Sequence, residues 1–121
     1  MSGEISYSFQ LNLRNGDLID LYSSGALLAD QSTAAAMRNT TTVPAAKTLL
    51  DLGSLTTPGW AVFKNLDDTN FIEVGIDVGG TFYPFLKLEP GEECPAKLGI
   101  TAIYAQADTS PVKLYYIIFE E

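Results

Sequence analysis

From residue 49 onward the sequence repeats one rhythm, in which short apolar runs alternate with clusters of turn-forming residues. Most runs are about five to eight residues long and rich in Val, Ile, Phe and Tyr, as strands are. The runs are TLLDLGSL, WAVFKN, FIEVGI, TFYPFLKL, CPAKLGITAIYAQA and VKLYYIIF, and the clusters between them are TTPG, LDDTN, DVGG, EPGEE and DTSP. This pattern predicts an all-β fold, and an antiparallel jelly-roll-like β-sandwich of about eight strands fits it best.

The first residues predict a hairpin. In EISYSFQLNL apolar and polar side chains alternate, which is typical of a half-buried strand. The apolar positions are Ile5, Tyr7, Phe9, Leu11 and Leu13. RNGD then supplies an Asn-Gly turn signal, and LIDLY follows as the returning strand. Because 121 residues are the size of one domain, we expect a single β-sandwich domain over 1–121.

Residues 23–48 are rich in Ala, Ser and Thr, which give no decisive period. Within them, STAAAMR favours a short helix capped by Ser32 or Thr33, because alanine is a strong helix former. RNTTTVP favours a strand that ends before Pro44, because threonine and valine fit a pleated surface.

The charge balance excludes several classes of partner. Seven basic residues stand against fifteen acidic ones, for a net charge of -8, and the lysines are scattered singly. Nucleic acids and anionic membranes are both bound largely through clusters of Lys and Arg, so neither is expected as a partner. The sequence also lacks a basic and apolar leader and any apolar run of about 20 residues, so we expect a soluble chain without a secretion signal.

The sequence lacks the residues that most catalytic sites need. There is no histidine, and Cys94 is the one cysteine, so zinc sites, Ser or Cys triads and histidine-ligated metals on cupin barrels are not expected. Cys94 follows Glu92 and Glu93, whose negative charge disfavours a thiolate. We therefore expect a protein that is not an enzyme and that needs no cofactor.

The segment LDDTN holds the densest group of carboxylates. Asp67 and Asp68 fall between two apolar runs, where aspartate favours turns by accepting hydrogen bonds from nearby backbone amides. The alternative is a weak calcium site, because Asp68, Asn70 and Glu73 offer alternate oxygen ligands. The turn is the favoured interpretation, since the glycine and distal glutamate of an EF-hand loop are absent.

Trp60 is the candidate surface aromatic. Sugar-binding sites often stack a ring on an exposed tryptophan, whereas the plainer interpretation places Trp60 at the start of a strand, capping one end of the core. A second aromatic residue two positions along the strand would favour a binding platform, but Val62 stands there. The core interpretation is favoured.

The last run, VKLYYIIF, is apolar on both faces. Val112, Leu114, Tyr116 and Ile118 form one face, and Tyr115, Ile117 and Phe119 form the other. A strand in a sandwich wall usually has one face in water, so the second face needs a partner, either another segment of the chain or another subunit. We favour a subunit, which makes Tyr115, Ile117 and Phe119 a candidate subunit interface.

The stretch LDLGSLTTPGWAVFKNLDDTNFIEVGI, with FLKLEPGE and IYAQADTSPVKLYYIIFEE, resembles small virion proteins of tailed bacteriophages, of the capsid decoration (cement) type and related tail-associated β-sandwich proteins. The resemblance covers about residues 49–121. It implies a jelly-roll-like fold, a homotrimer, the major capsid protein as partner and no catalytic residues. The expected location is the outer capsid surface of the virion, after synthesis in the host cytoplasm.

Two other functions stay open. A tail-associated receptor- or carbohydrate-binding module predicts exposed aromatic residues at one end of the sandwich. A small bacterial β-sandwich enzyme or binding module without a connection to virions predicts a monomer with an apolar pocket.

Overall fold

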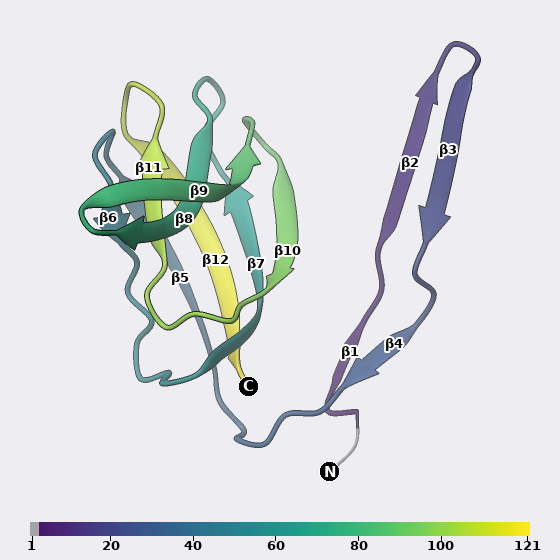
Figure 1. The fold of residues 1–121 in the computed structure, drawn as a ribbon, viewed down its shortest axis with the longest axis horizontal. Helices are drawn as coiled ribbons and strands as arrows, with labels where there is room; N and C mark the ends of the chain where they lie inside the picture. Colours follow the sequence, from purple (N-terminus) through teal and green to yellow (C-terminus); the bar gives the residue numbers. More distant parts are fainter. Residues whose placement is uncertain (1–2) are drawn as a thin grey trace. The chain divides into compact units, whose positions relative to one another are not determined.

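The computed structural model describes residues 3–121, which form strands, turns and loops without a helix. The chain divides into two units, one ending at Thr33 and one spanning Ala34–Glu121 (Figure 1). We describe each unit by itself. The β-sandwich lies within the second unit, whereas the sequence led us to expect one sandwich domain over 1–121.

The second unit is a sandwich of two four-stranded antiparallel sheets, in the orders β10-β7-β12-β5 and β6-β11-β8-β9. Its strands are β5 (Ala36–Val43), β6 (Thr48–Leu49), β7 (Pro58–Asn65), β8 (Ile72–Val78), β9 (Thr81–Leu88), β10 (Glu93–Lys97), β11 (Tyr104–Ala107) and β12 (Val112–Glu120). The first of these strands pairs with the last, the second with the second last, and so on inward to β8 and β9. This nested pairing is that of a jelly roll, so the predicted fold class is confirmed.

The core lies between the two sheets. Along β12 buried side chains alternate with more exposed ones, and the buried set is the four apolar residues that the sequence placed on one face together with Glu120. Each fully buried Leu, Ile or Phe side chain contributes about 1.5–3 kcal/mol to the free energy of folding. The core residues without measurable exposure are Val43, Phe63, Ile72, Val74, Ile103, Ala105, Val112, Leu114, Tyr116 and Ile118.

The short helix expected in STAAAMR is wrong, because these residues lead into strand β5. From Ala36 to Val43, β5 pairs with β12 in an unbroken register. Met37 and Val43 pack into the core, so pairing and burial override the helix preference of alanine. The end of the strand before Pro44 is confirmed.

Two segment boundaries also differ from expectation. Pro58 and Gly59 open strand β7 rather than forming a turn, and proline is tolerated at the first residue of a strand. A Cβ at Gly59 would lie 3.2 Å from the Cα of Glu121, so a residue without a side chain lets the two segments approach. The run CPAKLGITAIYAQA forms β10 and β11 rather than one strand.

The first unit is a long β-hairpin, which we call the hairpin. Its strands are β1 (Ile5–Tyr7), β2 (Gln10–Asn15), β3 (Leu18–Ser23) and β4 (Leu27–Ala29), and β2 pairs with β3 as β1 pairs with β4. Gly16 has φ 59° and no residue other than glycine has a positive φ within residues 3–121. Gly16 and Asp17 therefore form the turn with glycine at its first central position, as type II′ turns require.

The hairpin confirms the returning strand LIDLY, whereas the single strand expected over EISYSFQLNL is divided into β1 and β2, and the expected half-burial is not found. Ile5 is the only buried residue among residues 3–33, and the side chain of Leu11 is 76% exposed. The alternation of apolar residues correctly assigns them to one face. That face packs against no core of its own, because a two-stranded ribbon has no second layer.

Candidate interaction surfaces

The sheet β10-β7-β12-β5 turns one side away from the core, and we call this side the outer face. Tyr115, Ile117 and Phe119 lie on it, each partly exposed, between the buried residues of β12. Strand β12 is an inner strand of its sheet, so the three side chains stand in the middle of the outer face. Neither sheet nor loop of the sandwich covers them fully, and their role as a subunit interface stays a prediction.

The structure brings Trp60 to the same face. Val62 pairs directly with Ile117 across the two strands, and Trp60 points to the same side of β7 as Val62. Phe119 lies between the pairs that flank Trp60, at a β-bulge of β12. The interpretation of Trp60 as a core residue is therefore not supported.

The other aromatic residues on the face of Trp60 lie on the neighbouring strand β12 and not on β7 itself. The sequence showed only Val62 two positions along β7, and the register between β7 and β12 could not be read from either strand alone. The ammonium of Lys97, on the other neighbouring strand, lies 5.8 Å from the centre of the Trp60 ring. This distance suits a weak cation–π contact.

Charged groups lie at the margins of the outer face. Lys64 Nζ lies 3.7 Å from a carboxylate oxygen of Glu93, and Arg38 Nη1 donates to Tyr115 Oη at 3.5 Å. An apolar centre with a polar and charged rim is the usual arrangement of a protein–protein interface.

The LDDTN segment is a turn held by its own carboxylate. Asp67 Oδ2 accepts hydrogen bonds from the backbone N–H groups of Asn70 at 2.7 Å and Thr69 at 3.1 Å. Asp68 Oδ1 accepts one from the Thr69 hydroxyl at 2.9 Å. The carboxylate of Asp67 is thus engaged by the backbone, as the turn interpretation requires.

A buried amide that the sequence did not single out anchors this turn. Asn65 is fully buried at the end of β7, and its Nδ2 donates to the carbonyl oxygens of Asn70 and Leu88, both at 3.0 Å. Its Oδ1 accepts from the backbone N–H of Asp67 at 2.8 Å. The one available signal was an asparagine at a position where the alternation of β7 calls for an apolar residue.

Cys94 lies on the core side of β10 and is partly buried. Burial, and then the negative charge of Glu92, raise the pKa of its thiol. A raised pKa lowers the thiolate fraction at neutral pH, which agrees with an unreactive thiol. Within residues 3–121, no three Cys, Asp or Glu side chains come together in a group that could hold a metal ion, and no helix is long and apolar enough to cross a membrane.

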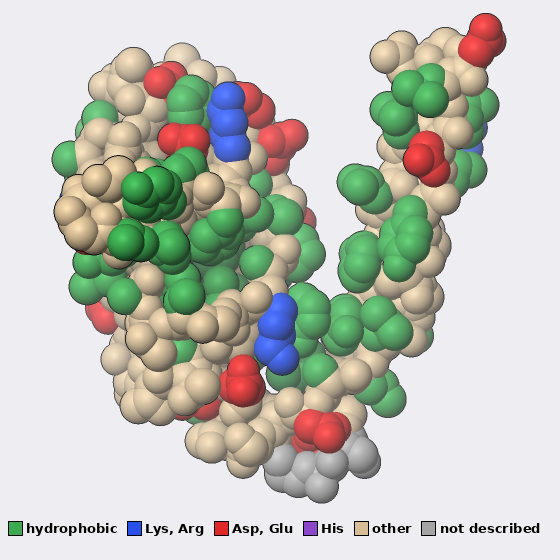
Figure 2. All heavy atoms as spheres, in the orientation of Figure 1, with side chains coloured by type: hydrophobic (Ala, Val, Ile, Leu, Met, Phe, Trp, Pro, Cys, Tyr) green, Lys and Arg blue, Asp and Glu red, His purple; other side chains and the backbone are tan. Residues whose placement is uncertain are grey.

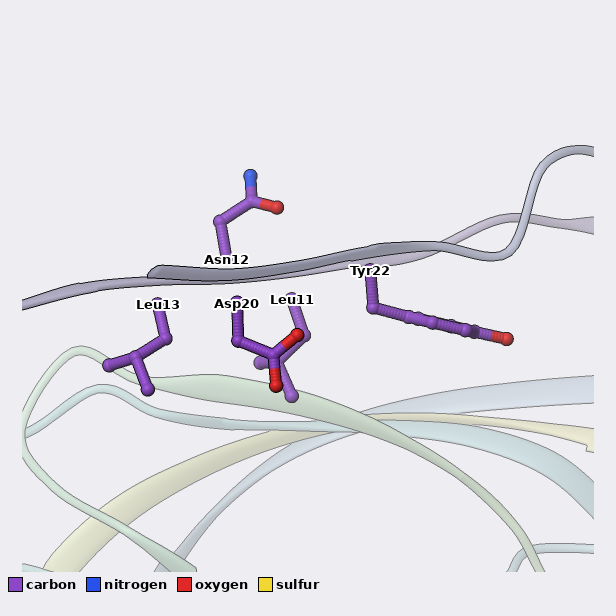
Figure 3. A pocket seen from close by; sticks show the side chains of 5 residues that line it. All are labelled: Leu11, Asn12, Leu13, Asp20 and Tyr22. Carbon is purple, nitrogen blue, oxygen red and sulfur yellow. The ribbon is translucent and has the colours of Figure 1, made fainter. Parts of the chain in front are cut away.

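The hairpin offers a second surface. By its register, Leu11 lies opposite Tyr22 and Leu13 opposite Asp20, so these four side chains share one face. Figure 3 shows them projecting from one side of the ribbon, with Asn12 on the other. Phe9 packs its ring 5.7 Å from that of Tyr22. Figure 2 shows hydrophobic side chains along the length of the hairpin.

Comparison of the chain with protein-family models, with curated proteins and with solved structures finds no match in any of the three. A jelly roll is shared by proteins of many functions, so the fold alone assigns none. Function has to be inferred from the two surfaces described above.

Proposed function

We propose that this chain is a non-enzymatic structural protein of a phage virion, a capsid decoration or cement protein. It binds the outer surface of the head as a homotrimer and stabilises the lattice of major capsid proteins. The observation that carries the proposal is the apolar centre of the outer face, where Val62 lies opposite Ile117 between partly exposed aromatic residues.

The charge of the chain supports an exterior position. A net charge of -8 disfavours contact with packaged DNA, whereas it does not hinder binding to the outside of a protein shell.

The proposed mechanism is mass action. A protein that binds only the mature, expanded lattice lowers the free energy of that lattice relative to every form that it does not bind. The stabilisation per binding site grows with the logarithm of the ratio between the free concentration of the decoration protein and its dissociation constant. It reaches about 2.7 kcal/mol when that ratio is one hundred. Summed over many sites on a shell, this stabilisation resists the internal pressure of packaged DNA.

One observation favours a second function, that of a tail-associated receptor- or carbohydrate-binding module. Trp60 shares the outer face with Tyr115 and Phe119, so an aromatic group exists there after all. Partly exposed aromatic rings on a rigid sheet are suited to stacking on sugar rings.

The test compares two aspartate variants for binding to heads. Ile117→Asp places a charge in the apolar centre of the outer face, and Thr81→Asp places the same charge on β9 of the other sheet, at a position exposed to solvent. We expect wild type and Thr81→Asp to be trimers that sediment with heads from which the protein has been stripped. We expect Ile117→Asp to be folded, monomeric and unbound, because an unpaired charge is costly to bury.

Three results would count against the proposal. A wild-type protein that fractionates with tails, or with neither part of the virion, contradicts head decoration. Equal head binding by Ile117→Asp shows that the outer face is not the contact. Glycan binding that is lost in Trp60→Ala, without head binding, establishes the carbohydrate-binding function instead.

A further inference from the structure

The turn of the hairpin holds two neighbouring groups that can react with each other. Asn15 ends β2, Gly16 and Asp17 form the turn, and Leu18 opens β3 as the partner of Asn15. The backbone nitrogen that follows an asparagine can close a five-membered ring with the side-chain amide carbon, which is one reason why asparagine is a thermolabile residue. Residues 15–18, which we call the tip, therefore contain both an amide electrophile and the nitrogen that can attack it.

Both reacting groups are accessible. The side chain of Asn15 is exposed, as are all side chains of β2. Within residues 3–121, no group accepts a hydrogen bond from the N–H of Gly16, which lies outside both strands. A Cβ built on Gly16 would meet nothing within 4 Å, so no neighbouring atom hinders the approach of the nitrogen or of water. The absence of a side chain at Gly16 also leaves the backbone free to rotate.

Ring closure requires the tip to open. A five-membered ring fixes the torsion about the Cα–C bond of Asn15 at a value that an extended strand does not adopt. Asn15 must therefore leave its pairing with Leu18 before the nitrogen of Gly16 can reach its Cγ. This opening costs little free energy, because a two-stranded ribbon is marginally stable and Ile5 is the only buried residue among residues 3–33.

Other asparagines of the chain lack this combination. Asn12 lies inside the β2–β3 ladder and is followed by the bulky Leu13. Asn39 is paired within β5 and donates to the Tyr116 hydroxyl. Asn65 is fully buried, and its Nδ2 donates to two backbone carbonyl groups. Asn12 is the closest comparison, since it shares the strand and the exposure of Asn15 but not the glycine.

We propose that Asn15 is a site of self-modification, at which the chain converts this residue to aspartate and isoaspartate. The nitrogen of Gly16 bonds to Cγ of Asn15, and the Cγ–Nδ2 bond breaks. The proton of the nitrogen passes through water to the departing ammonia, which leaves a succinimide ring. One water molecule then opens the ring. Cleavage between the nitrogen and Cγ gives aspartate, and cleavage between the nitrogen and the main-chain carbonyl carbon gives isoaspartate. Water is the only co-reactant, and no group is oxidised or reduced.

The modification changes the hairpin permanently. Isoaspartate carries the main chain through its side chain, which inserts one extra carbon atom into the backbone at residue 15. The pair of residues 15 and 18 then cannot form, because a two-residue turn fixes the register of the strands that it joins. Either product adds a negative charge beside Asp17, and the loss of ammonia makes the change irreversible. This inference rests on the hairpin alone and holds whether or not the chain decorates heads.

The first test follows the mass of the purified protein over days in mildly alkaline buffer. We expect each chain to gain one mass unit, located at Asn15 in the proteolytic peptide of the hairpin, with aspartyl and isoaspartyl forms separated by chromatography. Asn12 should stay unchanged in the same peptide. Asn15→Gln should keep its mass, because its ring would be one atom larger and closes far more slowly. A constant wild-type mass, an equal gain at Asn12 or in Asn15→Gln, or a product without isoaspartate overturns the proposal.

The second test measures whether the tip must open. Arg14 and Ile19 pair directly, one position from Asn15, and their side chains are close because this pair alternates with the hydrogen-bonded pair that closes the turn. Arg14→Cys and Ile19→Cys are combined in a Cys94→Ser chain, which is compared with itself in the oxidised and the reduced form. We expect the disulfide to slow the modification of Asn15 at least about tenfold, because it holds the strands together. Equal rates in the two forms would show that the reaction does not pass through an opened tip.

Discussion

The hydroxyl group of Tyr116 links strand β12 to Asn39 on β5 and to the backbone at Asp51. It donates a 2.7 Å hydrogen bond to the backbone carbonyl of Asp51, and it accepts one of 3.1 Å from Asn39 Nδ2. The side chain of Tyr116 is fully buried, and this burial raises the pKa of its phenol. The hydroxyl is thus a neutral, fully engaged group inside the core.

Removal of this hydroxyl should lower stability. In Tyr116→Phe the carbonyl of Asp51 and the amide of Asn39 each lose a hydrogen-bond partner, and we expect a loss of about 1–3 kcal/mol in the free energy of unfolding. Tyr115→Phe is the matched control on the same strand, because Tyr115 is partly exposed and its hydroxyl has only a 3.5 Å contact with Arg38. We expect it to change stability by less than about 0.5 kcal/mol. Urea unfolding of both variants is the measurement, and equal losses would contradict the prediction.

The two aspartates of the LDDTN turn should differ in importance. Asp67→Ala removes the acceptor of two backbone N–H groups, so we expect a loss of about 1–2 kcal/mol, whereas Asp68→Ala should stay within about 0.5 kcal/mol. Replacing both by Asn should cost no more than about 1 kcal/mol, because the amide oxygen at 67 still accepts. A melting temperature that rises with calcium in the wild type but not in the double Asn variant would reveal a metal site and refute the turn interpretation.

Glu120 should make stability depend on pH in the acidic range. Its carboxylate is nearly buried and accepts hydrogen bonds from Thr57 N at 2.9 Å and from the N–H and hydroxyl of Thr56. The bond from Thr57, and then those from Thr56, hold the pKa of this carboxyl below its ordinary value of 4.5. The unfolded chain therefore binds this proton first as the pH falls. The stabilisation is complete above the ordinary value and is lost as the pH drops through the folded-state pKa.

The check is a comparison of wild type with Glu120→Gln at several pH values from neutral to about 3. Because the two proteins share every other carboxylate, the difference between their urea midpoints isolates Glu120. We expect wild type to be the more stable at neutral pH and the difference to shrink on acidification. A difference that is constant with pH would show that the ionised carboxylate is not what stabilises this site.

Gly75 should not tolerate a side chain. It lies in β8 at a β-bulge opposite Pro84, and a Cβ there would stand 2.1 Å from the carbonyl oxygen of Tyr83. The clash is with backbone, so the strands must move apart, and Gly75→Ala should cost about 2 kcal/mol or more. Gly99→Ala is the control, since a Cβ at that position meets no atom within 4 Å. Thermal unfolding of the two variants decides the matter, and similar melting temperatures would be the contrary result.

The sequence predicted most of the sandwich because its strands carry two signals at once: every second side chain is apolar, and turn-forming residues stand at the strand ends. In β12, every second side chain packs into the core, and the flanking DTSP cluster sets the start of the strand. In β5 the signal failed, since small residues such as Ala36 fit both helices and strands, and only pairing with β12 decides between them. The alternation in β2 was correctly assigned to one face, but alternation says nothing about whether a second layer exists to cover that face.

The candidate surfaces were predicted less completely, because they depend on contacts between distant segments. Ile117 and Phe119 could be assigned to an outward face from their own strand. The neighbourhood of Trp60 could not, because it depends on the register between β7 and β12. The buried amide of Asn65 was missed because its partners, Asn70 and Leu88, are set by the fold and not by local sequence.

The central place of β12 governs when this protein can fold. β12 lies between β7 and β5, and it pairs with both along most of its length. These two strands are joined only through it, so their sheet stays open until Val112–Glu120 has been synthesised. Strands so far apart in the sequence pair slowly, because the chain between them must lose the entropy of loop closure before the paired strands gain any stabilising contacts. On the ribosome, the nascent chain therefore carries β7 without one of its two partner strands until β12 emerges, and it is exposed to aggregation and to chaperones for that interval.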